Sequence, residues 1–125
     1  MDVYLITSFN YISWFQCIDF LKKGKQVMVF VHARNATVKT GMALKEMAQN
    51  RGDTMVFESE SSAELGTAKG SVAKSRNKQL KELFEGGIGF HHAGMLRSDR
   101  NLVEKLFSQG FLKVCYLLVT LYSLI

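Results

Sequence analysis

Three continuous apolar runs dominate the hydrophobic pattern of this chain, and turn residues separate them. Val27–Val31, Ile88–His92 and Leu112–Val119 are rich in β-branched and aromatic residues. Such runs are typical of strands buried on both faces, which is the pattern of parallel sheets. We therefore predict a strand over each run, and a weaker further strand over Thr54–Phe57.

Helical spacing fills the stretches between the predicted strands. One helix is predicted from an N-cap at Asn35 to about Arg51, where Gly52 ends it. A second helix is predicted over 75–84, and a third from an N-cap at Ser98 to a stop at Gly110. The residues predicted to face inward on these helices are Thr37, Gly41, Leu44, Met47, Ala48, Leu80, Leu83, Phe84, Leu102, Val103, Leu106 and Phe107.

Two further segments lack a clear period. Met1–Leu21 is aromatic and apolar, which is compatible either with a helix packed on the domain or with a poorly placed end. Glu58–Ser71 is small, polar and glycine-containing, and we expect an exposed insertion or a mobile loop there. The chain ends in Thr120–Ile125, which is apolar and carries no turn signal.

Strands that alternate with helices predict the fold class. With 125 residues, the chain has the length of one domain or of part of one. The pattern predicts an α/β, three-layer sandwich with about four mostly parallel strands, built from βαβ units.

The net positive charge of the chain bears on which kinds of binding partner it suits. The formal net charge is +5 and every Lys and Arg lies between Lys22 and Lys113. A basic middle is compatible with an anionic partner such as nucleic acid, and equally with an ordinary solvated surface. The lysine-rich stretch 74–81 carries the same two readings, a solvated helix face or a face that follows phosphates.

Several kinds of chemistry lack the residues that they need. The stretch Gly66–Ser71 has neither the spacing nor the lysine of a phosphate-binding Walker A loop. His91 and His92 are adjacent on a predicted strand, so they point to opposite faces and do not share a metal ion. Cys17 and Cys115 have no metal-site spacing, and we predict neither a metal site nor a catalytic nucleophile. No bilayer-spanning apolar run is present, so no membrane partner is expected.

What remains is recognition at one edge of the sheet. The loops that follow two parallel strands emerge at the same edge, where α/β folds bind ligands. Helix starts expose N–H groups that attract phosphates, and nearby arginines add positive charge. The residues concerned are His32, Ala33, Arg34 and Asn35 in the first loop, and His92, Ala93, Gly94, Met95, Arg97 and Arg100 in and after the second. The alternative for Arg100 is a surface pair with Glu104, four residues on.

Two stretches carry a family resemblance. Gln26–Thr40, QVMVFVHARNATVKT, and Ser75–Val114, which contains FHHAGM, resemble the second RecA-like lobe of superfamily 2 nucleic-acid helicases. Within that superfamily the similarity is greatest to the two-cassette helicases related to the spliceosomal U5 helicase. Among these it is greatest to the N-terminal cassette of the helicases of activating signal cointegrator complexes. Val27–Arg34 corresponds to their motif IV and Phe90–Met95 to their motif IVa.

The resemblance implies a function. In that family both lobes together hydrolyse ATP with Mg²⁺ and move along single-stranded DNA or RNA with 3′ to 5′ polarity, and motifs IV and IVa lie on the nucleic-acid side. The same ten residues of the two loops are thereby implicated in nucleic-acid binding. The implied partners are a single strand, lobe one of the helicase and subunits of the cointegrator complex, in the nucleus and cytoplasm. The implied processes are alkylated-DNA repair, transcription coactivation and ribosome quality control.

The sequence also departs from the family pattern. Residues 25–114 match it, whereas residues 1–24 diverge and residues 115–125 form an apolar tail in place of motif V. Lobe one, with its Walker motifs, and motif VI find no counterpart. We therefore expect a fragment that binds no cofactor with its own residues and does not unwind alone. A truncated isoform that acts through protein interactions, or a product without function, are the alternatives.

Overall fold

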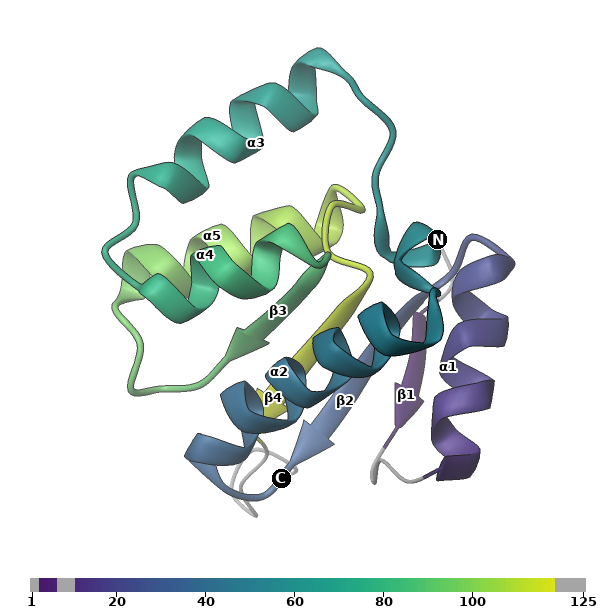
Figure 1. The fold of residues 1–125 in the computed structure, drawn as a ribbon. Helices are drawn as coiled ribbons and strands as arrows, with labels where there is room; N and C mark the ends of the chain where they lie inside the picture. The colour runs from purple at the N-terminus through teal and green to yellow at the C-terminus, as the bar shows by residue number, and fades with distance from the viewer. Residues whose placement is uncertain (1–2, 7–10, 119–125) are drawn as a thin grey trace.

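The computed structural model describes residues 3–6 and 11–118 of the chain. Within them the chain alternates strands with helices (Figure 1). In chain order the elements are β1 (Val3–Ile6), α1 (Tyr11–Lys22), β2 (Gln26–Val31), α2 (Arg34–Arg51), the short 3₁₀ helix η1 (Thr54–Phe57), α3 (Ala63–Ala73), α4 (Lys78–Glu85), β3 (Ile88–His91), α5 (Arg97–Ser108) and β4 (Val114–Leu118).

The four strands form one sheet in the order β1-β2-β4-β3, and every neighbouring pair is parallel. Helices α2 and α4 lie in front of the sheet in Figure 1, and α5 lies behind it. Helix α1 packs against β2 and against η1 at the side. This arrangement confirms the predicted α/β class with four parallel strands, and it is consistent with part of a RecA-like lobe.

Side-chain alternation along the strands builds the core. Val29, Tyr116 and Phe90 lie opposite one another across β2, β4 and β3, and all are buried. Gly89 points to the other face, where a Cβ atom would lie 2.6 Å from Leu112 Cδ1. At the amino end of β2, the buried side chain of Gln26 donates hydrogen bonds to the carbonyl oxygens of Phe107 (2.7 Å) and Leu112 (2.8 Å) and so ties the strand to the end of α5 and the segment before β4.

Two sequence predictions in the middle of the chain are wrong. Thr54–Phe57 is the 3₁₀ helix η1, since β1 occupies the position beside β2 and only Phe57 of this segment is buried. The expected loop Glu58–Ser71 holds most of α3. Its apolar residues Leu65, Ala68 and Val72 share one helical face and are buried, and Ser62 caps the helix by accepting a hydrogen bond from the Leu65 N–H.

Helix boundaries also differ from the prediction by one to three residues. Helix α2 begins at Arg34 with Ala33 as its N-cap, and α5 begins at Arg97 with Leu96 as its N-cap, so neither Asn35 nor Ser98 caps a helix. Helix α4 begins at Lys78 after the N-cap Asn77. The predicted glycine stops are confirmed, because Gly52 and Gly110 both adopt positive φ angles.

The amino-terminal stretch contributes a strand as well as the expected helix. Helix α1 buries Trp14, Cys17 and Ile18, which confirms the packed-helix alternative, whereas β1 was not predicted. Tyr4 of β1 stacks on Phe20 of α1 with ring centroids 3.6 Å apart. The tail 120–125 lies outside the described residues. In the described part of the chain, no helix combines the length and apolarity needed to cross a membrane.

Candidate nucleic-acid interface

The two predicted loops meet at the carboxyl edge of the sheet. β2 and β3 are parallel, each to β4, so the loops after them emerge on the same side (Figure 1). The Arg34 guanidinium lies against Gly94, where a Cβ atom would come within 2.6 Å of Arg34 Nη1. This close approach joins the two loops. We call residues 32–35 and 92–95, together with Arg97 and Arg100, the loop edge.

The second loop is held in a fixed shape by its own hydrogen bonds. His92 Nδ1 accepts a hydrogen bond from the Gly94 N–H at 3.0 Å, and the His92 carbonyl oxygen accepts one from the Met95 N–H at 3.2 Å. Ala93 and Gly94 are exposed at the tip. Met95 is 7% exposed and packs into the core. It therefore anchors the loop and does not offer its side chain to a ligand.

The first loop presents its residues to solvent. His32, Ala33, Arg34 and Asn35 are all exposed. No side chain caps the amino terminus of α2. The first N–H groups of a helix lack the usual intrahelical partner. The Ala36 N–H donates to the Ala33 carbonyl oxygen at 3.0 Å, so the N–H groups of Arg34 and Asn35 and the positive end of the helix dipole remain available to an anion.

The start of α5 repeats this feature. No side chain caps its amino terminus either, whereas α3 and α4 are capped by Ser62 and Asn77. Arg97, in the first turn, is exposed. Both helix starts at the loop edge therefore combine uncapped N–H groups with an exposed arginine.

Arg100 does not form the surface pair that was the alternative for it. Its side chain is half-buried, and its Nε atom is buried without a hydrogen-bond partner. Glu104 is instead bound by His91, with Nε2 and Oε1 2.9 Å apart. The alternative of a surface pair between Arg100 and Glu104 is therefore not seen among the described residues, because Glu104 pairs with the side chain of His91.

His92 follows the last residue of β3, and its ring centroid lies 5.8 Å from that of Phe90. Burial, the positive charge of Arg34 and the neighbouring His91 lower the pKa of His92. A neutral imidazole is what the loop requires, because Nδ1 must keep a lone pair to accept the Gly94 N–H.

A shallow open hollow of about 670 Å³ joins the loop edge to two helices. Its lining residues are Arg34, Asn35, Val38, Lys39, Gln79 and His92. Lys39 and Gln79 were not predicted as site residues. Asn35 and Lys39 are four residues apart on α2, a spacing that could have identified Lys39, whereas Gln79 reaches the hollow only through the tertiary fold.

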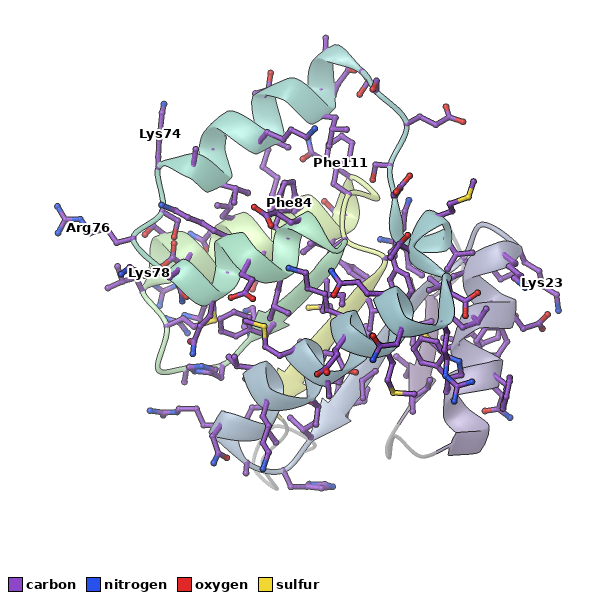
Figure 2. All side chains as sticks on the ribbon, in the orientation of Figure 1. Lys23, Lys74, Arg76, Lys78, Phe84 and Phe111 are labelled. Atoms are coloured by element: carbon purple, nitrogen blue, oxygen red, sulfur yellow. The ribbon has the colours of Figure 1, made fainter. Side chains whose placement is uncertain are left out.

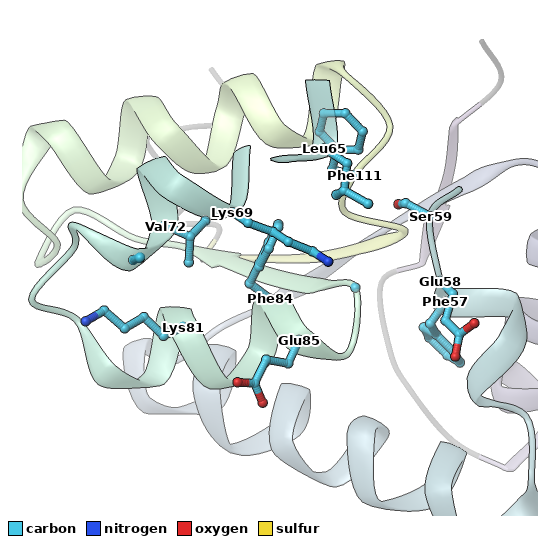
Figure 3. Close-up of a pocket in the computed structure, with 12 residues that line it drawn as sticks. Phe57, Glu58, Ser59, Leu65, Lys69, Val72, Lys81, Phe84, Glu85 and Phe111 are labelled. Atoms are coloured by element: carbon cyan, nitrogen blue, oxygen red, sulfur yellow. The ribbon is translucent and has the colours of Figure 1, made fainter. Parts of the chain in front are cut away.

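Other chemistry finds little support in the described residues. They contain no group of three or more His, Cys, Asp or Glu side chains that could hold a metal ion. Burial raises the pKa of both the Cys17 and the Cys115 thiol to about 12. A separate groove of about 580 Å³ lies between α3 and α4 (Figure 3), and no residue of the loop edge lines it.

The chain is similar in sequence to several known proteins. The chain is 58% identical over 98 residues to activating signal cointegrator 1 complex subunit 3 of Gallus gallus. It is 46% identical over 112 residues to the DExH-box ATP-dependent RNA helicase DExH14 of Arabidopsis thaliana. It is 42% identical over 103 residues to the RQC trigger complex helicase SLH1 of Saccharomyces cerevisiae. No protein-family model matches the chain.

These matches cover most of the chain and little of each relative. They include 78%, 90% and 82% of the chain, but only 4%, 5% and 5% of the chicken, Arabidopsis and yeast proteins respectively. The chain thus corresponds to a short segment of much longer helicases.

Proposed function

Because this chain is a homologue of a segment of activating signal cointegrator 1 complex subunit 3 and of related helicases, we propose that its loop edge binds the backbone of single-stranded DNA or RNA. The observation that carries this proposal is the contact between the two loops. Arg34 of the first loop lies against Gly94 of the second, so two uncapped helix starts face one continuous surface.

The composition of this surface suits phosphates and not base edges. Backbone N–H groups and exposed arginines bind phosphate oxygens without reading the base sequence. Arg34 and Arg97 are both exposed, and neither side chain is hydrogen-bonded or ion-paired within the described part of the chain. We therefore expect binding that depends strongly on salt and weakly on sequence.

The proposed role in a helicase is to hold the strand. In a complete two-lobe enzyme, ATP hydrolysis between the lobes would drive movement, while this segment would grip the single strand during each step. On its own, we expect the chain to bind without unwinding. Lobe one and subunits of a cointegrator complex are the partners that we propose for the longer protein, in the repair, coactivation and ribosome quality control processes named above.

Fluorescence anisotropy with labelled single-stranded DNA and RNA tests the proposal. We expect binding at about 50 mM salt that weakens by one to two orders of magnitude at about 200 mM. The double variant Arg34→Ala, Arg97→Ala should lose most of this binding. The matched control Lys22→Ala, Lys23→Ala removes the same charge at the far end of the molecule and should keep it. Absence of binding by the wild-type chain at low salt would refute the proposal.

A further inference from the structure

A second group of basic residues lies beside the loop edge. The turn between α3 and α4 carries Lys74, Arg76 and Lys78, and all of these side chains extend into solvent at one corner of the molecule (Figure 2). None of them takes part in an ion pair with another described residue. We call residues 74–78 the basic turn.

The basic turn is fixed to α5 by a buried carboxylate. Ser75 Oγ donates a hydrogen bond to Asp99 Oδ1 at 2.7 Å and accepts one from the Asn77 N–H at 3.1 Å. Asp99 is only 6% exposed and lies in the first turn of α5. The basic turn is therefore held at the helix start that carries Arg97, so its position relative to the loop edge is set by the fold.

The topology places the basic turn at the same edge of the sheet. Helix α4 runs back to the start of β3, so its amino terminus lies near the carboxyl end of that strand (Figure 1). The hollow described above confirms this proximity, because Gln79 of α4 lines it together with Arg34 and His92. One surface thus continues from the loop edge to the basic turn.

We propose that the basic turn is a second phosphate-binding site, which contacts phosphates of the same single strand beyond those held by the loop edge. This inference rests on the proposed function. Like charges this close in sequence repel one another. An approaching polyanion relieves that repulsion and releases condensed counterions at each phosphate contact.

The test compares short and long oligonucleotides, because a longer strand offers more phosphates to both sites at once. Anisotropy is measured with oligonucleotides of about 5 and about 15 nucleotides, on the wild-type chain and on Lys74→Gln, Arg76→Gln, Lys78→Gln. We expect the triple variant to bind the long strand roughly tenfold more weakly and the short strand within about twofold of wild type. The slope of log affinity against log salt for the long strand should fall by roughly 2, at about 0.7 per phosphate contact.

A matched variant controls for net charge. Lys22→Gln, Lys23→Gln, Lys105→Gln removes the same charge away from this corner, and it should bind both strands nearly as wild type does. A second variant, Ser75→Ala, keeps every charge but releases the turn from Asp99. It should weaken only the long strand, by roughly threefold, with a folded far-ultraviolet circular dichroism spectrum.

The outcomes separate this inference from the proposed function. If the wild-type chain binds neither strand, the proposed function itself fails. If the wild type binds and Arg34→Ala, Arg97→Ala loses binding, but the triple variant matches wild type on the long strand, only this inference is overturned. If the triple variant and its charge-matched control lose equal affinity for the long strand, the effect is one of net charge and this inference is overturned. If polyglutamate competes for the basic turn as well as the long oligonucleotide does, the turn suits an acidic protein ligand, and this inference is overturned as well.

Discussion

Replacing Gly94 with alanine offers a sharp test of how the two loops work together. The new Cβ atom would lie 2.6 Å from Arg34 Nη1, 2.8 Å from Cζ and 3.1 Å from Nε. Ordinary contacts begin near 3.4 Å, so the guanidinium must retreat by about 0.8 Å. Because the obstacle is the end of a long, exposed side chain and not backbone, we expect the loop to keep its shape and Arg34 to move.

We expect Gly94→Ala to change the stability of the fold little but to weaken the binding of single strands. Gly94 does not have a positive φ angle, so alanine gains about 0.4–1 kcal/mol from the unfolded state, which offsets an off-rotamer cost of about 0.5–1.5 kcal/mol for Arg34. The free energy of unfolding should therefore change by less than about 1 kcal/mol. Affinity for single strands should fall roughly threefold, less than the roughly tenfold loss expected for Arg34→Ala.

A double-mutant cycle provides the measurement. Anisotropy titrations on Gly94→Ala, Arg34→Ala and the double variant should show that Gly94→Ala has no effect once Arg34 is absent. Gly66→Ala serves as a control, because no atom lies within 4 Å of its added Cβ. If Gly94→Ala weakens binding by the same factor with and without Arg34, the loss arises from the loop itself and the reasoning fails.

Three further predictions concern stability and reactivity. Gly87→Ala should lower the free energy of unfolding by about 3 kcal/mol and Tm by roughly 10 °C in a thermal melt, because φ is +69° and the Cβ would lie 2.2 Å from the Phe57 carbonyl oxygen; an unchanged Tm would contradict this. The pKa of His92 is lowered in the folded chain, so its contribution to stability is present above about pH 6.5 and is lost as pH falls through the folded pKa. In denaturant titrations, the free energy of unfolding should therefore fall less between about pH 7.5 and 5.5 for His92→Gln than for the wild type. An identical pH dependence in the two proteins would contradict this account. With pKa values of about 12, Cys17 and Cys115 should resist iodoacetamide at about pH 8 and react only on unfolding, as followed by mass spectrometry; rapid labelling of the folded chain would disprove it.

Much of the sheet was predictable because buried parallel strands appear in the sequence as continuous apolar runs. Val27–Val31 and Ile88–His92 are continuous apolar runs with glycines before them, and both became strands. Helix α3 was missed because Gly66 and Gly70 lower its intrinsic helix propensity. Packing of its buried apolar face, and the Ser62 cap, outweigh that propensity, and neither can be read from local sequence alone.

The site was predictable only at the level of topology. Parallel strands must place the loops at Arg34 and Gly94 on one edge, but the contact between these two residues depends on the register and on side-chain paths. The same holds for Ser75 and Asp99, which are 24 residues apart and form a hydrogen bond. Neither residue carries a local signal that names its partner.

The distribution of charge along the sheet axis follows from the same topology. Helices α2, α4 and α5 all run back from the carboxyl edge, so the basic residues at their starts gather there although they span residues 34 to 100 of the chain. Towards the opposite ends of α2 and α4, a second hollow is lined by Lys45 as well as by Glu58 and Glu85, and Lys45 Nζ lies 3.9 Å from Glu85 Oε2. Lys22, Lys23 and Lys25 place basic residues at the far end of the sheet as well, so the uncapped helix starts with their exposed arginines, and not positive charge alone, distinguish the loop edge. The gathering of these helix starts is therefore a property of the whole fold, which is why the loop edge and the basic turn must be tested on the folded chain and not as isolated peptides.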